Sequence, residues 1–292
     1  MGSLYMLQWI TILFFFTLVI GVIAPIGGVG GGVLFVPLAV AFLPFNVDFI
    51  RGAGLLMALT SSLSSSPLFV TKGLANLRIV VPIALVSIIT SICGSLVGLW
   101  LTNSFPRGDS YFSIFLGILL IFIFIVMLTS RDVEYPSERP VGSFAAKFGL
   151  QGGWFEPSLN RTVDYHAGNF TYALLCFSAV GFIAGMFGLG AGWASVPVFN
   201  LVMGVPIKAA VTTSMALITL NSAAASWVYI ARGAVLPLIC IPSVLGMSIG
   251  ARIGARLAVK AKSRFITGLV MAVMLFAAAV DIYKGIRGVG LL

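Results

Sequence analysis

The sequence predicts an all-α polytopic membrane protein with two inverted repeats of about five hydrophobic segments each. Glycine-rich helix breaks, either re-entrant or within broken helices, are predicted to meet near the membrane midplane. The first observation behind this fold class is composition: 60% of the 292 residues are hydrophobic, 9% are charged, and the mean hydropathy is +1.12. A soluble globular chain carries roughly a quarter charged residues. The chain is therefore predicted to lie in a lipid bilayer.

The second observation is an internal repeat with a period of 160 residues. It runs from the first glycine cluster far downstream without a gap. The matched positions are Gly21, Gly28, Gly30, Gly32, Pro37, Gly73 and Pro82 in the first half and Gly181, Gly188, Gly190, Gly192, Pro197, Gly233 and Pro242 in the second. A duplicated apolar unit with a glycine-rich break in each half is typical of a secondary transporter that binds its substrate between the repeats.

Ten apolar segments follow one another along the chain. Eight are close to the ~20 residues that cross a hydrocarbon core, and they cover residues 4–24, 51–70, 77–101, 111–129, 170–187, 209–230, 235–251 and 265–283. Two shorter segments, 33–45 and 193–203, follow the glycine clusters, and we expect half-helices or re-entrant arms there. Residues 1–130 then form the first transmembrane repeat, 131–169 a connecting loop, and 170–292 the second transmembrane repeat.

The relative orientation of the repeats depends on the glycine breaks. A re-entrant hairpin of two arms leaves an odd number of crossings in each half, and the halves then insert with opposite topology. A single kinked span in each half would make the repeats parallel. We favour inverted repeats.

Basic residues predict which side of the membrane each loop faces. If the ten segments alternate sides, one side collects five basic residues and the other collects eleven. The smaller set is Arg51, Arg107, Arg232, Lys284 and Arg287, and the larger set is Lys72, Arg78, Arg131, Arg139, Lys147, Arg161, Lys208, Arg256, Lys260, Lys262 and Arg264. The side richer in Lys and Arg faces the cytoplasm, so both termini are predicted outside and the connecting loop inside. Because the basic residues form no single stripe, the net charge of +9 does not indicate a nucleic-acid partner.

The connecting loop is predicted to be a tether with an interfacial stretch. Its aromatic residues, Phe144, Phe148, Trp154 and Phe155, stand beside Lys and Gly, which suits the headgroup zone of a membrane. The single histidine, His166, has no second metal ligand nearby and is expected to be a solvated loop residue.

The glycine clusters at 25–32 and 185–192 are the first candidate site. Glycine tolerates positive φ and lets a ligand approach the main chain, and the helix that restarts after each cluster has N–H groups without intrahelical partners. An anion is the natural occupant of such helix N-termini. The alternative is that the glycines serve close helix packing. The residues predicted to contact substrate here are Gly28, Gly30, Gly31, Gly32, Gly188, Gly190, Ala191 and Gly192.

A hydroxyl-rich group in the spans after the breaks is the second candidate. Hydroxyls and an amide can donate hydrogen bonds to an anion without a fixed charge that would trap it. The predicted contacts are Ser62, Thr213, Ser214, Asn221 and Ser222. Each could instead link helices, a contribution of about 0.6 kcal/mol.

Charged residues define the third candidate. Lys72 and Arg232 are 160 residues apart, and inverted repeats would place one at each mouth of a pathway, where it would attract anions; the alternative is an ordinary helix C-terminal cap. Asp281 is expected to form a surface ion pair with Lys284. No span centre is predicted to carry Asp, Glu or His, which argues against a carboxylate proton relay or an intramembrane cation site.

The sequence contains none of the common catalytic motifs. It has no paired carboxylates, Ser/His/Asp set, HExxH or Walker loop, and no cofactor or metal is predicted. Cys93, Cys176 and Cys240 lie inside apolar segments without CxxC spacing and are expected to be small buried hydrophobic residues.

The doubled motif resembles the TauE/SafE family of sulfite and organosulfonate exporters. The residues that carry the resemblance are Gly32-Val-Leu-Phe-Val36-Pro37, Gly192-Trp-Ala-Ser-Val196-Pro197, the Ala210-Val-Thr-Thr-Ser214 segment and the small-residue helix from Gly246 to Gly254. The resemblance implies a bacterial inner-membrane permease that moves sulfite, sulfoacetate or a similar sulfur oxyanion, most often outward. The first half departs from the pattern with Arg51-Gly-Ala-Gly-Leu where the second half has the Thr-Ser pair.

The expected partners are a small anionic substrate and the lipid bilayer, with a homodimer as an open alternative. An importer of a related anion and a non-transporting scaffold or accessory subunit are the alternative functions. A negative cell interior favours anion export by about 2.3 kcal/mol per charge per 100 mV, so ion coupling is not required.

Overall fold

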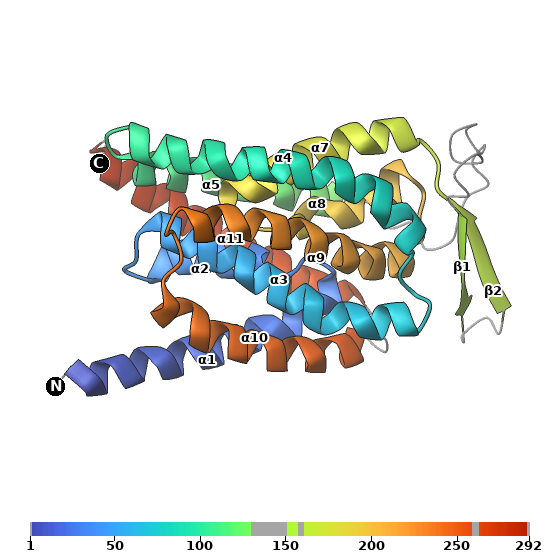
Figure 1. The fold of residues 1–292 in the computed structure, drawn as a ribbon, viewed down its shortest axis with the longest axis horizontal. Coiled ribbons are helices and arrows are strands. Elements are labelled where there is room, and N and C mark those ends of the chain that lie inside the picture. The colour runs from blue at the N-terminus through green and yellow to red at the C-terminus, as the bar shows by residue number, and fades with distance from the viewer. Residues whose placement is uncertain (1, 130–150, 157–160, 259–262, 291–292) are drawn as a thin grey trace.

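The computed structural model describes residues 2–129, 151–156, 161–258 and 263–290, and these form an elongated helical bundle with a small hairpin at one end (Figure 1). The helices of the first half are α1 (Gly2–Gly27), α2 (Gly31–Phe42), α3 (Val47–Thr71), α4 (Leu77–Ser104) and α5 (Gly108–Thr129). Those of the second half are α7 (Phe170–Phe187), α8 (Gly192–Pro197) with a π-helical turn at Val198–Val202, α9 (Ile207–Ala231), α10 (Pro237–Ala258) and α11 (Ser263–Val289). Seven of the described helices are long and apolar enough to cross a membrane, which confirms a multi-pass membrane protein.

Both predicted helix breaks are present, and both have the same backbone. Gly28 and Gly30 have φ of 67° and 74°, and Gly188 and Gly190 have φ of 71° and 74°, a region that only glycine enters freely. The helix that follows the first break, α2, has 12 residues. At 1.5 Å per residue it is about 18 Å long, well short of a hydrocarbon core of about 30 Å.

Glycines let pairs of helices approach closely. A Cβ added at Gly250 of α10 would lie 3.0 Å from the Cα of Gly21 in α1, and one added at Gly94 of α4 would press on the carbonyl of Phe182 in α7. These two helix pairs are equivalent under the 160-residue shift. Packing through small residues is the usual way for helices to associate in lipid.

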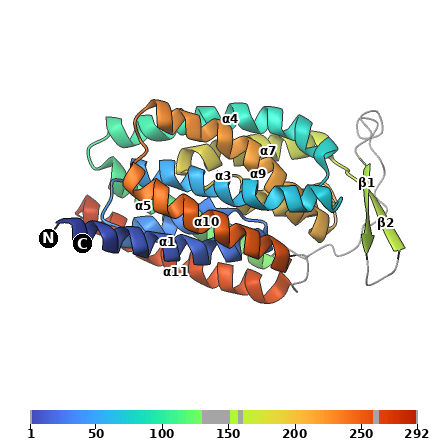
Figure 2. The same cartoon turned by 60° about the horizontal axis from the view of Figure 1, so that its bottom comes forward.

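Helices α3 and α9, which are equivalent in the repeat, lie side by side in opposite directions. Near one end the Ser66 and Thr219 hydroxyls are 3.4 Å apart. Near the other end a Cβ added at Gly52 would press on the carbonyl of Ala234. The start of α1 and the end of α11 lie at one end of the bundle, and the hairpin lies at the opposite end (Figures 1 and 2).

The hairpin was not predicted. Strands β1 (Gln151–Glu156) and β2 (Arg161–His166) pair antiparallel, with Gln151 opposite His166 and Glu156 opposite Arg161. The signal for a strand was the alternation of Val163 and Tyr165 with the polar residues Thr162, Asp164 and His166. His166 is exposed, as expected, but it ends a strand.

Part of the interfacial prediction lies outside the described residues. Phe144 and Phe148 belong to the segment 130–150, whose structure is not described. Trp154 and Phe155 lie in strand β1.

The expected surface ion pair between Asp281 and Lys284 is wrong. Asp281 is 0% exposed, and the described part of the chain holds no salt bridge to it. The Lys284 amine instead donates to the Val40 carbonyl of α2 at 3.3 Å. The error comes from helix rotation: Asp281 is on a face of α11 that packs into the bundle, which its spacing from Lys284 could not reveal. Asp281 lies near the end of the predicted span 265–283, so the expectation that no span centre carries Asp, Glu or His stays a prediction.

Candidate functional site

The two glycine breaks are in direct contact. A Cβ added at Gly32 would lie 2.5 Å from the carbonyl oxygen of Leu189, and one added at Gly192 would press on the carbonyl of Val29. These contacts are equivalent under the 160-residue shift. Each break therefore approaches the start of the other half's short helix, and only a residue without a side chain fits at either point.

Helices α3 and α9 pack against the breaks. A Cβ added at Gly30 would lie 3.4 Å from the side chain of Ile218 in α9. One added at Gly190 would lie 2.7 Å from the Cβ of Ala58 in α3 and 3.2 Å from the hydroxyl of Ser222 in α9. The breaks thus lie against the middle of both hydroxyl-rich helices.

Buried polar atoms without partners mark this region. The hydroxyls of Ser61 and Ser222, both amide atoms of Asn221 and the indole nitrogen of Trp193 make no hydrogen bond within the described structure. Ser61, Asn221 and Ser222 are at most 1% exposed. The antiparallel register of α3 and α9 puts Ser61 within about one turn of the other two along the bundle.

Buried polar atoms without partners indicate that a ligand or water binds beside them. More than nine in ten buried polar groups in proteins are hydrogen-bonded, and each one left unpaired costs about 1–3 kcal/mol. A bound ligand or ordered water would satisfy them.

The chemistry of the group suits an oxyanion. Two hydroxyls, an amide NH₂ and an indole N–H can all donate. Nearby, α2 begins after its N-cap residue Gly30, which has no side chain that could accept a hydrogen bond from the first turn. The first N–H groups of α2 and the positive end of its dipole therefore point toward the break. The described residues contain no group of three or more His, Cys, Asp or Glu that could hold a metal ion.

The other predicted hydroxyls are engaged elsewhere. Ser214 donates to the carbonyl of Gly28 at 2.9 Å and so holds the first break in place. Ser62 is buried and donates to the Leu59 carbonyl of its own helix at 3.1 Å. Thr213 accepts from the backbone N–H of Asn76 at 3.0 Å, toward the hairpin end.

The remaining predicted break residues serve close approach. A Cβ added at Gly31 would lie 2.8 Å from both the Met247 sulfur and the Met57 carbonyl. One added at Gly188 would lie 2.6 Å from the Arg51 carbonyl. Ala191 is fully buried at the N-cap of α8. These glycines therefore allow close packing. That they also let a ligand approach the main chain stays a prediction.

Lys72 and Arg232 lie at opposite ends of the bundle. Each is the exposed C-cap residue of its helix, α3 and α9 respectively. Since these helices run in opposite directions, the two cations are separated as the mouth hypothesis requires. Their effect on anions stays a prediction.

Arg51 is a buried cation that the sequence analysis placed at the surface. It is 0% exposed. Its Nη1 pairs with the Asp48 carboxylate at 2.8 Å and donates to the Gly98 carbonyl at 3.2 Å, and its Nη2 donates to the carbonyl of Met186. The guanidinium carbon is 4.7 Å from the centre of the Phe112 ring.

Arg51 therefore helps to hold the second break. Helix α7 ends just before it, and the last carbonyls of a helix lack intrahelical partners. Arg51 satisfies Met186, and the Tyr229 hydroxyl donates to the Gly185 carbonyl at 3.0 Å. The sequence signal is the departure of Arg51 from the repeat. The predicted span begins at this residue, whereas α3 begins at Val47.

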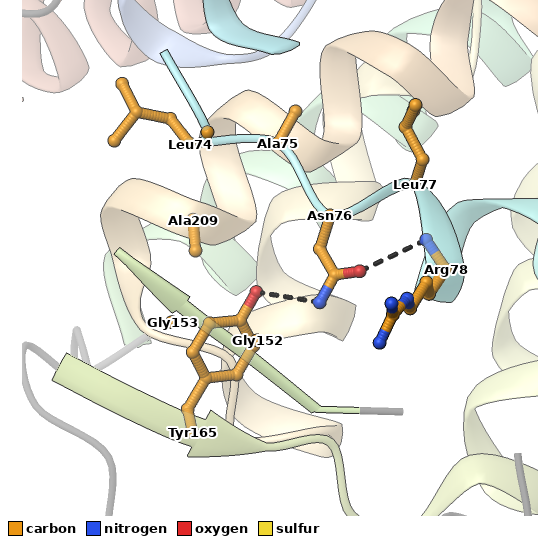
Figure 3. Close-up of a pocket in the computed structure, with 10 residues that line it drawn as sticks. Leu74, Ala75, Asn76, Leu77, Arg78, Gly152, Gly153, Tyr165 and Ala209 are labelled. Atoms are coloured by element: carbon orange, nitrogen blue, oxygen red, sulfur yellow. Dashed lines mark hydrogen bonds between the residues drawn. The ribbon is translucent and has the colours of Figure 1, made fainter. Parts of the chain in front are cut away.

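A pocket of about 360 Å³ lies at the hairpin end, away from the breaks (Figure 3). Asn76 is one of its lining residues, and it donates to the Tyr165 hydroxyl at 3.2 Å and accepts from the Arg78 backbone N–H at 3.1 Å. Burial raises the pKa of Tyr165, and the hydrogen bond from Asn76 lowers it by less, so the hydroxyl stays protonated at neutral pH. The pocket shares no lining residue with the glycine breaks.

Comparison with known proteins identifies the family. The sequence model of the family described as sulfite exporter TauE/SafE matches residues 13–281, which is most of the chain. The chain belongs to this family. A relative in Bacillus subtilis (strain 168), described as probable membrane transporter protein YunE, is 27% identical over 277 residues, covering 92% of this chain and 96% of the relative. No solved structure matches the chain.

Family membership confirms the resemblance drawn from the doubled motif. TauE/SafE proteins are membrane transporters, and this chain is a membrane transporter of that family. The match spans both glycine breaks as well as α3 and α9.

Substituting Gly30 by Ala separates ligand approach from packing. The methyl would occupy the break at an ordinary 3.4 Å from Ile218. The main cost to folding is therefore the backbone conformation of Gly30, with φ of 74° and ψ of 155°, which essentially only glycine adopts and which costs an alanine about 1–3 kcal/mol. Gly73→Ala is the matched control, because Gly73 has φ of 68° with no atom within 4 Å of an added Cβ. We expect both variants of the purified protein to lose thermal stability, while only the folded fraction of Gly30→Ala binds sulfite more weakly. Equal affinity in the two variants would leave the first break with a packing role alone.

Proposed function

We propose that this TauE/SafE protein is a secondary transporter that exports a small sulfur oxyanion, such as sulfite, sulfoacetate or another organosulfonate. The observation that carries the proposal is the unpartnered, buried Ser222 hydroxyl beside Gly190, with the unpartnered amide of Asn221 next to it in α9. The family description, sulfite exporter, supports the substrate class.

The bound anion would accept hydrogen bonds from both halves of the protein. Backbone N–H groups of Gly31 and Gly32 would face it from α2, and the side chains of Asn221 and Ser222 would face it from α9. A sulfite or sulfonate group has three oxygens, which can use several donors at once. Because the donors are neutral, the anion is attracted by partial charges and hydrogen bonds and can still leave.

The proposed architecture is an inverted repeat. The opposite directions of α3 and α9, and the equivalent contacts that each break makes with the other, support it. In such transporters one repeat rocks against the other around a fixed site, so the site opens to each side in turn.

The proposed orientation places both termini outside the bacterial inner membrane and the hairpin in the cytoplasm. Lys72, Arg78, Arg161 and Lys208, all from the larger set of basic residues, lie at the hairpin end, which supports a cytoplasmic hairpin. Anion exit would then follow the membrane potential, worth about 2.3 kcal/mol per charge per 100 mV. Lys72 would attract anions at the cytoplasmic mouth and Arg232 at the outer one.

Liposomes that contain only the purified protein test the function. We expect uptake from a panel of sulfite, sulfoacetate, taurine, sulfate and thiosulfate to show saturable transport of at least one sulfur oxyanion. Asn221→Ala should weaken its binding roughly 10- to 100-fold, since a hydrogen bond to a charged group contributes about 1.5–3 kcal/mol. Ser226→Ala is the control, because the Ser226 hydroxyl bonds within its own helix to Ala223. Absence of transport for the whole panel would favour a scaffold or accessory role.

A cysteine at Asp164, an exposed position of β2, tests the orientation. On a background without the three native cysteines, it should resist an impermeant thiol reagent in intact spheroplasts and react in inverted membrane vesicles. A cysteine at Arg232 should behave in the opposite way. Labelling of position 164 from outside would show that the hairpin faces outward and would contradict the proposed orientation.

A further inference from the structure

Asp281 is a buried carboxylate that the proposed anion site does not use. It is 0% exposed, and neither carboxylate oxygen has a hydrogen-bond partner in the described structure. Asp48 shows the contrast, since its carboxylate pairs with Arg51 and accepts from Thr102 at 2.8 Å. Asp281 has no such support.

Helix geometry places Asp281 on the face of α11 that lies between α2 and α5. On α11, Ile282 packs where a Cβ added at Gly117 of α5 would lie, and Lys284 reaches the Val40 carbonyl of α2. At 100° per residue, the direction of Asp281 falls between that of Lys284 and that of Ile282. Its neighbours one turn earlier, Ala277 and Ala278, are also buried.

Among the described residues, no cation forms a salt bridge with Asp281. The Lys284 amine is directed to Val40 and forms no salt bridge within 4.0 Å of the carboxylate. Helix α2 has no titratable residue, and α1 has only Tyr5. Helix α5 has Asp109 and Tyr111, both in its first turn, and Arg107 beside it donates to the Val289 carbonyl near the end of α11.

The proton is the ligand that fits this carboxylate. An ionised carboxylate buried without partners is too costly to persist in an apolar interior, and protonation removes the charge. A hard metal cation would need several further oxygen ligands, whereas the Asp281 oxygens have no polar partner in the described structure.

We propose that Asp281 binds a proton in this conformation and that its release and rebinding are coupled to anion transport. The coupling rests on the proposed function and runs through α2. That helix begins at the first glycine break, and Val40 lies nine residues on from Gly31, about 14 Å along the axis. Movement of α2 during transport would admit water to Asp281. The carboxyl O–H bond then breaks and its proton passes to that water to form hydronium, and in the reverse step the carboxylate takes a proton from hydronium and releases water.

Infrared spectroscopy of the purified protein tests the proton site without any substrate. We expect the carbonyl stretch of a protonated carboxylic acid at neutral pH, present in the wild type and in Asp109→Asn and absent from Asp281→Asn. Asparagine mimics the neutral acid in size and charge, so the variant should fold. If the wild type and Asp281→Asn have the same carboxylic acid band, Asp281 is ionised and the proposal fails.

Proton flux in liposomes tests the coupling. Sulfoacetate is the probe, because sulfite itself exchanges a proton near neutral pH and would obscure the signal of a pH dye. We expect a sulfoacetate gradient to drive proton movement through the wild type, and Asp281→Asn to move sulfoacetate with the proton signal of protein-free liposomes. Equal proton flux in the two proteins, or none in a wild type that transports sulfoacetate, would overturn the coupling. A wild type that moves no sulfoacetate would count against the proposed substrate, and the infrared result would still decide the proton site.

Discussion

The structure depends on how two interruptions of helix are satisfied inside a membrane protein. Each break leaves main-chain groups without helical partners, and lipid offers none. In this fold the breaks lie against each other and are enclosed by α3 and α9. Helix α9 supplies Ser214 for the Gly28 carbonyl and Tyr229 for the Gly185 carbonyl, and α3 supplies Arg51 for the Met186 carbonyl. Close helix packing through glycine, the antiparallel register of α3 and α9, and the buried polar cluster all follow from this enclosure.

The two halves share a backbone but hold their breaks with different side chains. At the second break, Arg51 and Tyr229 satisfy the end of α7; the equivalent positions of the other half are Val211 and Phe69, which can donate nothing. At the first break Ser214 donates to Gly28, whereas its equivalent, Gly54, only lies close to the Gly188 carbonyl. Such unequal support lets one break be held more rigidly than the other, which suits a protein whose halves must move relative to each other.

The parts of the fold that glycine and hydropathy dictate could be predicted from the sequence. The breaks were located correctly because four positions with positive φ require glycine, and the short helices because the apolar runs after them are brief. Burial of Arg51 and Asp281 could not be predicted, because it depends on how far each helix is rotated toward its neighbours. The same limit explains Thr213, whose hydroxyl was expected in the site and instead binds the backbone of Asn76. Of the predicted residues, Ser222 lies beside Gly190 and Asn221 is its neighbour in α9, and their lack of hydrogen-bond partners emerged only from the structure.

Hydrogen–deuterium exchange of the purified protein, with and without sulfite, tests most directly whether the two breaks form one anion site. If they do, the segments 25–33 and 185–193 should gain protection together over the same range of sulfite concentration, because one ligand is held by backbone groups of both. Protection confined to the hairpin pocket around Asn76, with both breaks unchanged at saturating sulfite, would contradict the account.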